Sequence, residues 1–186
     1  APLYERSDAR GTGMGTLAIR HGAIITCDER RRILTGGVLL ADGERLTAVL
    51  EADEAATSPQ AAAADIEIDA GGCVVIPGLI DSHAHMQQLL VRGEGDDLPL
   101  PRWLAEVLWR SLTVLTPRLW ELAAQVACIE MLKSGTTYVF ENPLPPIAQA
   151  DAAAQAIDDA GMRGTVAPII PDRGYPQELL LDPGET

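Results

Sequence analysis

The sequence predicts an α/β protein in which a small β-sandwich precedes a layer of parallel strands and helices. Short apolar runs separated by turn residues fill the chain up to about residue 76. Beyond that point, strand-like and helix-like segments follow one another in the order β-α-β-α-β, which is typical of a parallel sheet covered by helices. We therefore assign residues 14–76 to the β-sandwich part and 77–186 to the αβ part. Residues 1–13 are interpreted as a leader, linker or tag, or as a loosely held N-terminal arm.

The composition is that of an acidic globular protein. Of 186 residues, 47% are hydrophobic, and the formal net charge is −13. The arginines are scattered, whereas a nucleic-acid partner requires a basic stripe. No apolar run approaches the roughly 18 residues that would predict a membrane span, and the first residues lack the apolar segment of a signal peptide. The sequence has three widely spaced cysteines, which favours reduced thiols and a cytoplasmic location.

Several short strands are expected before residue 77. The segment 17–26 is expected to form a strand pair, or one bent strand, around His21-Gly22. Apolar runs at 37–40 and 46–50 flank Asp42-Gly43, which is a strong hairpin signal. His21 is interpreted as a turn or surface histidine and not as a metal ligand.

The stretch that follows the hairpin is expected to lack regular structure at first. Residues 51–64 are rich in alanine and polar residues and include Ser58-Pro59, so we expect a surface loop there. Ile66 and Ile68 then alternate with acidic residues, which indicates one more short strand.

The clearest helix begins at Thr116-Pro117, where a capping residue precedes proline at the first helical position. Lys133 suits the last turn and Gly135 the residue beyond the helix end. Apolar residues between these limits recur at helical spacing and form one stripe: Leu119, Leu122, Val126, Ile129 and Leu132. Helices are also predicted over 102–112 and 145–160, and strands over 136–140 and 163–170.

The strongest functional signal is the stretch 71–86, GGCVVIPGLIDSHAHM. Pro77 cannot donate to a sheet, so one strand is expected to end near it and another to start just beyond. If residues 79–85 are extended, the two-residue period places Asp81, His83 and His85 on one face. Two imidazoles spaced in this way can converge on one metal ion.

The segment VVIPGLIDSHAH resembles the first barrel strand of the amidohydrolase superfamily, whose members carry an H-x-H motif after a V-x-P-G run. The loop that follows indicates one branch of this superfamily. Arg92-Gly93, Asp96-Asp97-Leu98-Pro99-Leu100 and Trp103-Leu104 are similar to a loop of the cytosine-deaminase-like branch. That branch includes triazine chlorohydrolases and adenosine- and guanine-type deaminases. The resemblance implies the N-terminal portion of a (β/α)8 TIM-type barrel after the β-sandwich.

The resemblance also implies a metal-dependent hydrolase, an aminohydrolase or a chlorohydrolase that acts on a nitrogen heterocycle. His83 and His85 would hold one divalent ion, with zinc more expected than iron, and the ion would lower the pKa of a bound water. The family takes two further histidines and an aspartate from later strands, which are missing here. We therefore expect this chain to be the N-terminal part of a longer enzyme and to be inactive alone.

Four further residues are candidates for positions beside the metal or the substrate. Asp81 is expected either to orient a ligand or to cap backbone amides, and Glu141 either to lie at the site or to cap a loop. Trp103 would stack on a flat substrate or pack at a helix start. Gln87, two residues beyond His85, is the fourth candidate.

Two alternatives to the deaminase interpretation stay open. The hydantoinase and dihydroorotase branch holds two metals bridged by a modified lysine on a later strand; the only lysine of this sequence, Lys133, ends a helix. The other alternative is a non-catalytic fragment that acts in folding or interaction. The expected partners are a small heterocyclic substrate and either the missing part of the enzyme or a second copy of the chain, because an incomplete sheet exposes its edges.

Overall fold

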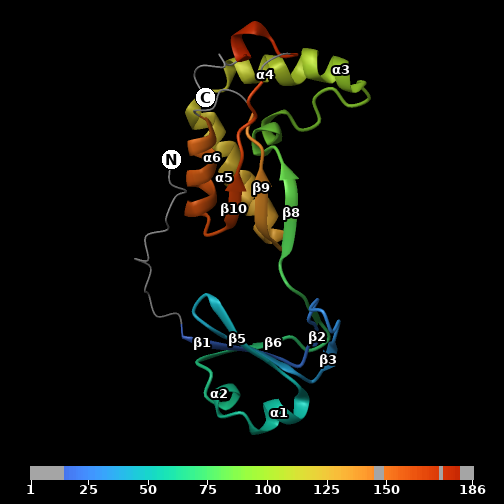
Figure 1. Cartoon of the computed structure of the whole chain (residues 1–186), viewed down its shortest axis with the longest axis vertical. Coiled ribbons are helices and arrows are strands. Elements are labelled where there is room, and N and C mark those ends of the chain that lie inside the picture. Colours follow the sequence, from blue (N-terminus) through green and yellow to red (C-terminus); the bar gives the residue numbers. More distant parts are fainter. Residues whose placement is uncertain (1–14, 145–148, 172–173, 181–186) are drawn as a thin grey trace. The chain divides into compact units, whose positions relative to one another are not determined.

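The computed structural model describes residues 15–144, 149–171 and 174–180. The chain divides into two compact units, Ala1–Pro77 and Gly78–Thr186, and each is described by itself. The interpretation of residues 1–13 falls outside the described residues. Figure 1 shows mostly strands in the first unit and alternating strands and helices in the second.

The described part of the first unit contains two mixed sheets. One has the strand order β5-β4-β1-β6 and the other β3-β2-β7. The β4–β5 hairpin predicted around Asp42-Gly43 is confirmed, with Asp42 opposite Arg45. The strands are β1 (Thr16–Arg20), β2 (Ala23–Ile25), β3 (Ile33–Thr35), β4 (Val38–Asp42), β5 (Arg45–Leu50), β6 (Ile66–Asp69) and β7 (Val74–Val75).

The segment 17–26 forms two strands that do not pair with each other. β1 belongs to the four-stranded sheet and β2 to the three-stranded one. The chain turns between them at His21, which has a positive φ of 63°. The His21 ring is exposed, and its Nδ1 lies 2.9 Å from Asp69 Oδ1, in agreement with its interpretation as a turn residue.

The surface loop predicted over 51–64 is wrong, because two short helices form there. These are α1 (Ala52–Thr57) and α2 (Pro59–Ala62). The Glu54 carboxylate accepts the Glu51 N–H at 3.1 Å, and Ser58 Oγ accepts the Ala61 N–H at 3.2 Å. Side chains that cap a helix start in this way stabilise helices that are otherwise too short to persist.

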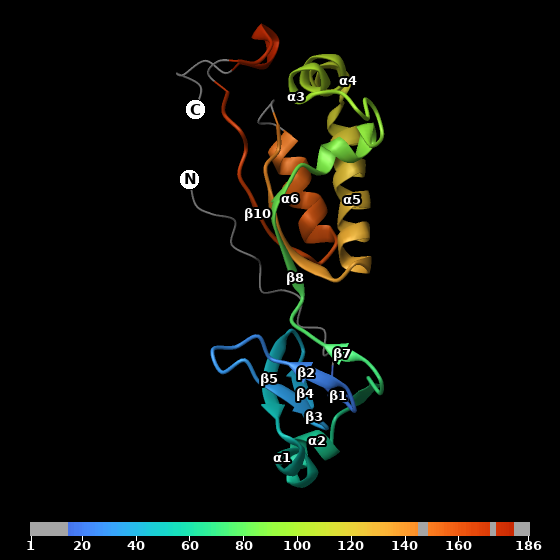
Figure 2. The same cartoon turned by 90° about the vertical axis from the view of Figure 1, so that its right-hand side faces the viewer.

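The second unit is built on a parallel sheet with the strand order β10-β9-β8. The strands are β8 (Leu79–Ala84), β9 (Thr136–Glu141) and β10 (Arg163–Val166), and the helices α5 (Pro117–Lys133) and α6 (Gln149–Asp159) join them in turn. Both helices lie on the same side of the sheet (Figure 2). The predicted β-α-β-α-β order is therefore confirmed, while closure into a barrel stays a prediction.

Two predicted boundaries in this unit change. The third strand was expected over 163–170 but ends at Val166, just before Pro168, which has no N–H to donate to a sheet. The helix expected over 145–160 is described from Gln149 to Asp159, and residues 145–148 lie outside the described residues.

The predicted limits of helix α5 are confirmed. Thr116 Oγ1 accepts the Leu119 N–H at 3.3 Å, Pro117 is the first helical residue, and Lys133 is the last. Gly135 follows with a positive φ of 88°, a conformation in which glycine avoids the steric cost of a side chain.

The apolar stripe of α5 does not form its buried face. Leu119, Leu122, Val126, Ile129 and Leu132 are between 37% and 55% exposed. The buried face consists mainly of small residues, together with one tryptophan: Trp120, Ala123, Ala124, Ala127 and Cys128. Small side chains allow α5 to approach the sheet and α6 closely. This close packing, and not the periodic leucines, decides which face of α5 is buried.

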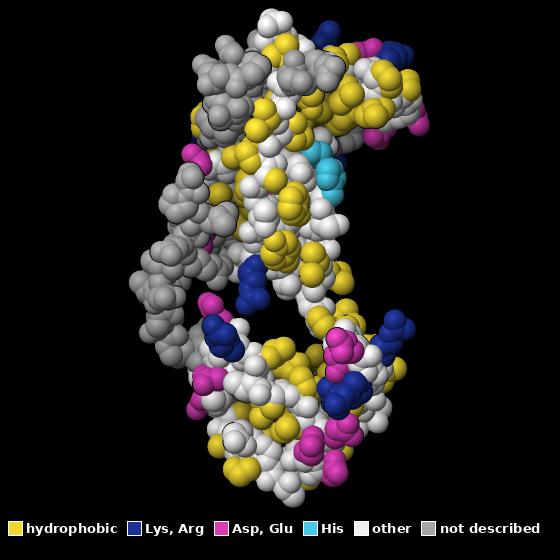
Figure 3. Space-filling model, in the orientation of Figure 1, with side chains coloured by type: hydrophobic (Ala, Val, Ile, Leu, Met, Phe, Trp, Pro, Cys, Tyr) yellow, Lys and Arg dark blue, Asp and Glu magenta, His cyan; other side chains and the backbone are white. Residues whose placement is uncertain are grey.

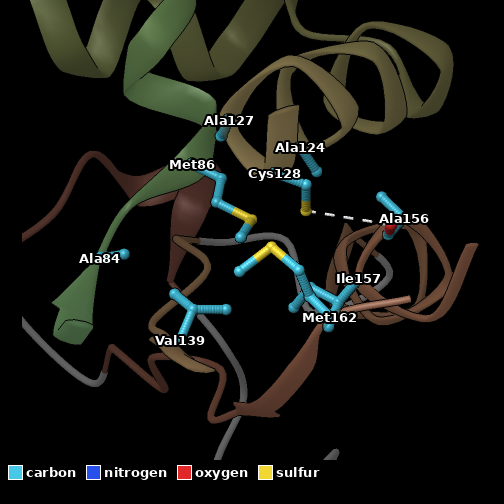
Figure 4. Close-up of a cluster of buried hydrophobic side chains, with 9 residues drawn as sticks. All are labelled: Ala84, Met86, Ala124, Ala127, Cys128, Val139, Ala156, Ile157 and Met162. Atoms are coloured by element: carbon cyan, nitrogen blue, oxygen red, sulfur yellow. Dashed lines mark hydrogen bonds between the residues drawn. The ribbon is translucent and has the colours of Figure 1, made fainter. Parts of the chain in front are cut away.

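The core of the second unit lies between these helices and the sheet (Figure 4). Ala124 and Cys128 of α5 meet Ala156 of α6, and Val139 of β9 lies beneath them. The Cys128 thiol points at the Ala156 carbonyl oxygen at 3.9 Å. Interiors of this kind are close-packed, so an added side chain has no space to occupy.

Replacing Ala156 with leucine is expected to destabilise the chain by about 1–3 kcal/mol, because overpacking forces neighbouring side chains out of their preferred rotamers. Ala154→Leu on the exposed face of the same helix is the matched control and is expected to change stability by less than about 0.5 kcal/mol. Urea unfolding of both variants measures the difference. Equal effects at the two positions would contradict the packing described here.

A helical segment follows β8 and the loop after it. The predicted helix 102–112 is confirmed in type and extends over Leu100–Val114, as α3 (Leu100–Trp103), a π-helical stretch η2 (Leu104–Leu108) and α4 (Trp109–Val114). The 3-10 helices η1 (Met86–Val91) and η3 (Gln177–Leu179) complete the elements of the residues that the structure describes. Among the described residues, no helix has both the length and the apolar character needed to cross a membrane.

Candidate metal centre

Strand β8 brings His83 and His85 together at its C-terminal end. The centroids of the two rings lie 4.9 Å apart, and their planes meet at 83°. β8 ends at Ala84, and its pairing with β9 shifts register between Asp81 and Ala84. Histidine side chains of this unit are visible at the surface in Figure 3. The end of one strand therefore presents two imidazoles side by side.

The His85 ring is held by the backbone of the neighbouring strand end. Its Nδ1 lies 2.6 Å from the Asn142 carbonyl oxygen, which can only accept, so Nδ1 carries the proton and Nε2 keeps its lone pair. Burial lowers the pKa of His85, and the nearby His83 lowers it further, while the Asn142 hydrogen bond opposes the shift. A neutral ring with a free Nε2 is the form that binds a metal ion.

The His83 ring is exposed, and besides His85 it lies close to the side-chain amide of Asn142. Asn142 Nδ2 lies 3.3 Å from His83 Nδ1. The His83 backbone N–H donates to Asp81 Oδ1 at 3.1 Å. Asp81 therefore caps the backbone of the strand end, which is one of the two roles expected for it.

Glu141 lies buried at the end of β9, the strand next to the histidine pair. Both of its carboxylate oxygens accept the Met86 N–H, at 3.1 and 3.0 Å. Burial raises the pKa of Glu141 to about 8; the charge of Asp81 adds to the shift, and the Met86 hydrogen bond opposes it. Glu141 thus fixes the chain immediately after His85, which corresponds to its expected capping role.

Gln87 and Trp103 lie in different surroundings. Gln87 is 2% exposed, and neither of its amide atoms has a hydrogen-bond partner among the described residues. Trp103 Nε1 donates to the Glu94 carbonyl oxygen at 3.2 Å, so its ring anchors the acidic loop. A pocket of about 520 Å³ is lined in part by Trp103, Asp81 and His85; His83, Gln87 and Glu141 are not among its lining residues.

The pair of histidines forms an incomplete metal site within the described residues. No group of three or more His, Cys, Asp or Glu side chains there is arranged to hold a metal ion. Catalytic zinc ordinarily takes three protein ligands and one water. Two imidazoles with a free Nε2 on His85 match the ligand type that zinc prefers, so the residues fit the ion in kind but not in number.

Asn142 is the residue of this site that sequence reasoning missed. It directly follows β9, as His85 directly follows β8. Because the carboxyl ends of adjacent parallel strands lie at the same edge of a sheet, a polar residue just after the second strand falls beside the histidines. Its position just after the predicted strand 136–140 could have identified it as a neighbour of the histidines.

Comparison with known proteins finds a matching family model and several similar proteins. The family model described as "Amidohydrolase family" matches residues 74–184. A 5-methylthioadenosine/S-adenosylhomocysteine deaminase of Syntrophobacter fumaroxidans is 35% identical over 180 residues, covering 94% of this chain and 38% of that protein. A 5'-deoxyadenosine deaminase of Methanococcoides burtonii is 32% identical over 160 residues, covering 83% of this chain and 33% of that protein. The chain thus spans less than two fifths of either relative.

Solved structures show the same architecture. A variant of atrazine chlorohydrolase TrzN from Arthrobacter aurescens, complexed with zinc and atraton, superimposes with a TM-score of 0.80 at 25% identity, covering 91% of this chain and 40% of that one. An adenosine deaminase from Xanthomonas campestris with bound zinc gives a TM-score of 0.73 at 28% identity, covering 86% of this chain and 35% of that one.

Proposed function

Because the chain belongs to the amidohydrolase family, we propose that it forms the first part of the metal site in a hydrolase that deaminates a nitrogen heterocycle. The observation that carries this proposal is the His83–His85 pair, in which the Asn142 carbonyl leaves Nε2 of His85 free. Relatives named as deaminases of adenine nucleosides favour an amino leaving group. Removal of chloride from a triazine is the second candidate, favoured by the similarity to atrazine chlorohydrolase.

His83 and His85 would hold one divalent ion, and zinc is the first choice because the similar structures contain it. The chemistry supplied by such an ion is the activation of water, whose pKa falls towards neutrality on coordination. Hydrolytic deamination then adds water at a ring carbon and releases ammonia.

The other candidate residues would support this pair. Asp81 holds the His83 backbone, and Glu141 holds the backbone just beyond His85. Fixing the backbone on both sides of the motif limits where the two rings can lie, and a preorganised ligand pair binds an ion at a lower entropic cost.

The remaining ligands and the groups that move protons to the leaving amine would come from outside this chain. Within the described residues, β8 and β10 each pair with β9 alone, so one edge of each has no strand beside it. Such edges favour association with further strands. We propose that the remainder of the same enzyme covers them, with a second copy of the chain as the alternative.

The purified 186-residue chain is expected to show no measurable deaminase activity and only weak zinc binding, because two histidines make an incomplete site. Its intact mass first establishes that no other polypeptide is present. Ammonia release is then measured with 5-methylthioadenosine, adenosine, guanine and a triazine, with and without added zinc. Robust turnover by this chain alone would contradict the proposal that other parts complete the site.

A further inference from the structure

Asn142 contacts both histidines of the pair, although it lies 57 and 59 residues away from them in sequence. Its carbonyl oxygen faces His85 Nδ1 at 2.6 Å, and its side-chain Nδ2 faces His83 Nδ1 at 3.3 Å. Its own N–H donates to the Ala84 carbonyl oxygen at 2.9 Å, between the two histidines. One residue is thus bonded to three consecutive positions of the motif.

The two contacts of Asn142 differ in which histidine tautomers they allow. A carbonyl oxygen can only accept, so the proton of a neutral His85 ring is fixed on Nδ1 and the lone pair on Nε2. A side-chain amide can donate through Nδ2 or accept through Oδ1. The contact with His83 therefore allows either ring tautomer, depending on which amide atom faces it.

The observed amide orientation leaves His83 without a free Nε2. Nδ2 faces His83 Nδ1 and also lies 3.3 Å from the Phe140 carbonyl oxygen. With Nδ2 as donor, Nδ1 is the acceptor, and the proton of the neutral ring is on Nε2. Rotating the amide by roughly 180° would place Oδ1 against Nδ1 and leave Nε2 free, but it would also place Oδ1 against the Phe140 carbonyl oxygen, which can only accept, so the observed orientation is favoured.

We propose that Asn142 is a positioning residue that sets the tautomers of both histidines. Its carbonyl keeps His85 in the form that can bind an ion through Nε2, and its side-chain amide, held by the Phe140 carbonyl oxygen, favours the His83 form with a protonated Nε2 over the form with a free one. The metal-binding consequence rests on the proposed function, whereas the tautomers themselves are properties of the chain without an ion.

Nuclear magnetic resonance of ring nitrogens tests the tautomers directly. The sequence has three histidines, so protein labelled with ¹⁵N only in histidine gives three pairs of ring signals. At a pH where the rings are neutral, His85 of the wild type is expected to carry its proton on Nδ1 and His83 on Nε2. His21, which pairs with Asp69 in the other unit, is the internal control.

Two substitutions separate the side chain of Asn142 from its carbonyl. Asn142→Ala keeps the carbonyl, so His85 is expected to be unchanged while the His83 signals move towards an average of both tautomers. Asn142→Asp offers only acceptor oxygens and is expected to fix the His83 proton on Nδ1. Circular dichroism and urea unfolding of each variant show whether the chain stays folded. An identical His83 spectrum in the wild type and both folded variants would overturn the proposal.

Zinc titration followed by the same signals distinguishes this inference from the proposed function. Because the wild-type side chain favours the His83 tautomer whose Nε2 is protonated, while Asn142→Ala frees this tautomer and keeps the carbonyl beside His85, Asn142→Ala is expected to bind zinc at least as tightly as wild type. Asn142→Asp is expected to bind at least as tightly as wild type. If a large excess of zinc leaves the His83 and His85 signals of the wild type unmoved, the proposed function fails, while the tautomer result still decides the role of Asn142.

Discussion

Replacing His83 or His85 with asparagine is expected to lower kcat/KM for deamination about a thousandfold or more in the complete enzyme that contains this chain. Loss of a metal ligand removes the activation of water. A thousandfold decrease in kcat/KM corresponds to about 4 kcal/mol of transition-state stabilisation. The measurement is ammonia release together with the zinc content of each purified variant. Both variants are expected to lose zinc as well as activity.

His21→Asn is the matched control for these variants. His21 is exposed, lies in the other unit and pairs with Asp69, so its loss is expected to leave kcat/KM within about threefold of wild type and zinc content unchanged. A His83 variant with normal zinc content and full activity would remove this residue from the metal site.

The second large effect concerns the buried carboxyl of Glu141. Glu141→Ala leaves the buried Met86 N–H without an acceptor, and an unpaired buried donor costs about 1–3 kcal/mol. Glu141→Gln retains an acceptor oxygen and is expected to restore most of the lost stability. Urea unfolding at pH 5 measures both variants, and equal losses in the two would contradict the role of the Met86 hydrogen bond.

The stability of the wild type relative to Glu141→Gln is expected to depend on pH. The pKa of Glu141 is about 8 in the folded chain, above its ordinary value of 4.5. The folded state therefore binds more protons than the unfolded state between these values, and stability falls as pH rises through this window. Each pKa unit corresponds to about 1.4 kcal/mol. Between pH 5 and pH 8 the free energy of unfolding of the wild type is therefore expected to fall by a few kcal/mol relative to that of the glutamine variant.

Glu130→Gln is the control for this titration. The exposed Glu130 pairs with Arg92, whose hydrogen bond lowers its pKa, so Glu130 stays ionised from pH 5 to pH 8. The stability difference between Glu130→Gln and wild type is therefore expected to be constant over that range. A difference for Glu141→Gln that is equally constant would show that its carboxyl is not held neutral.

Features encoded by neighbouring residues were predictable from the sequence. Thr116-Pro117 and Gly135 set the limits of α5 through local backbone chemistry, and Asp42-Gly43 set the β4–β5 hairpin. The capping interactions of Glu54 and Ser58 are equally local, and they could have identified α1 and α2. The loop was predicted from composition alone, without regard to these capping residues.

Features that depend on distant contacts were not predictable in the same way. Which face of α5 is buried depends on the closeness of α6 and the sheet, so the leucine stripe was a poor guide. The spacing of His83 and His85 predicted a pair, but not that Asn142 would bond both rings across the strand ends. That contact follows only from the parallel pairing of β8 with β9.

The most direct test of the histidine pair as a metal site is anomalous X-ray diffraction at the zinc edge, from crystals of the chain soaked in excess zinc. The account predicts a peak between the two rings, at about 2.0–2.1 Å from one nitrogen of His83 and one of His85. Zinc bound only elsewhere, for example at the exposed thiols of Cys27 or Cys73, with no peak at the histidine pair, would contradict it.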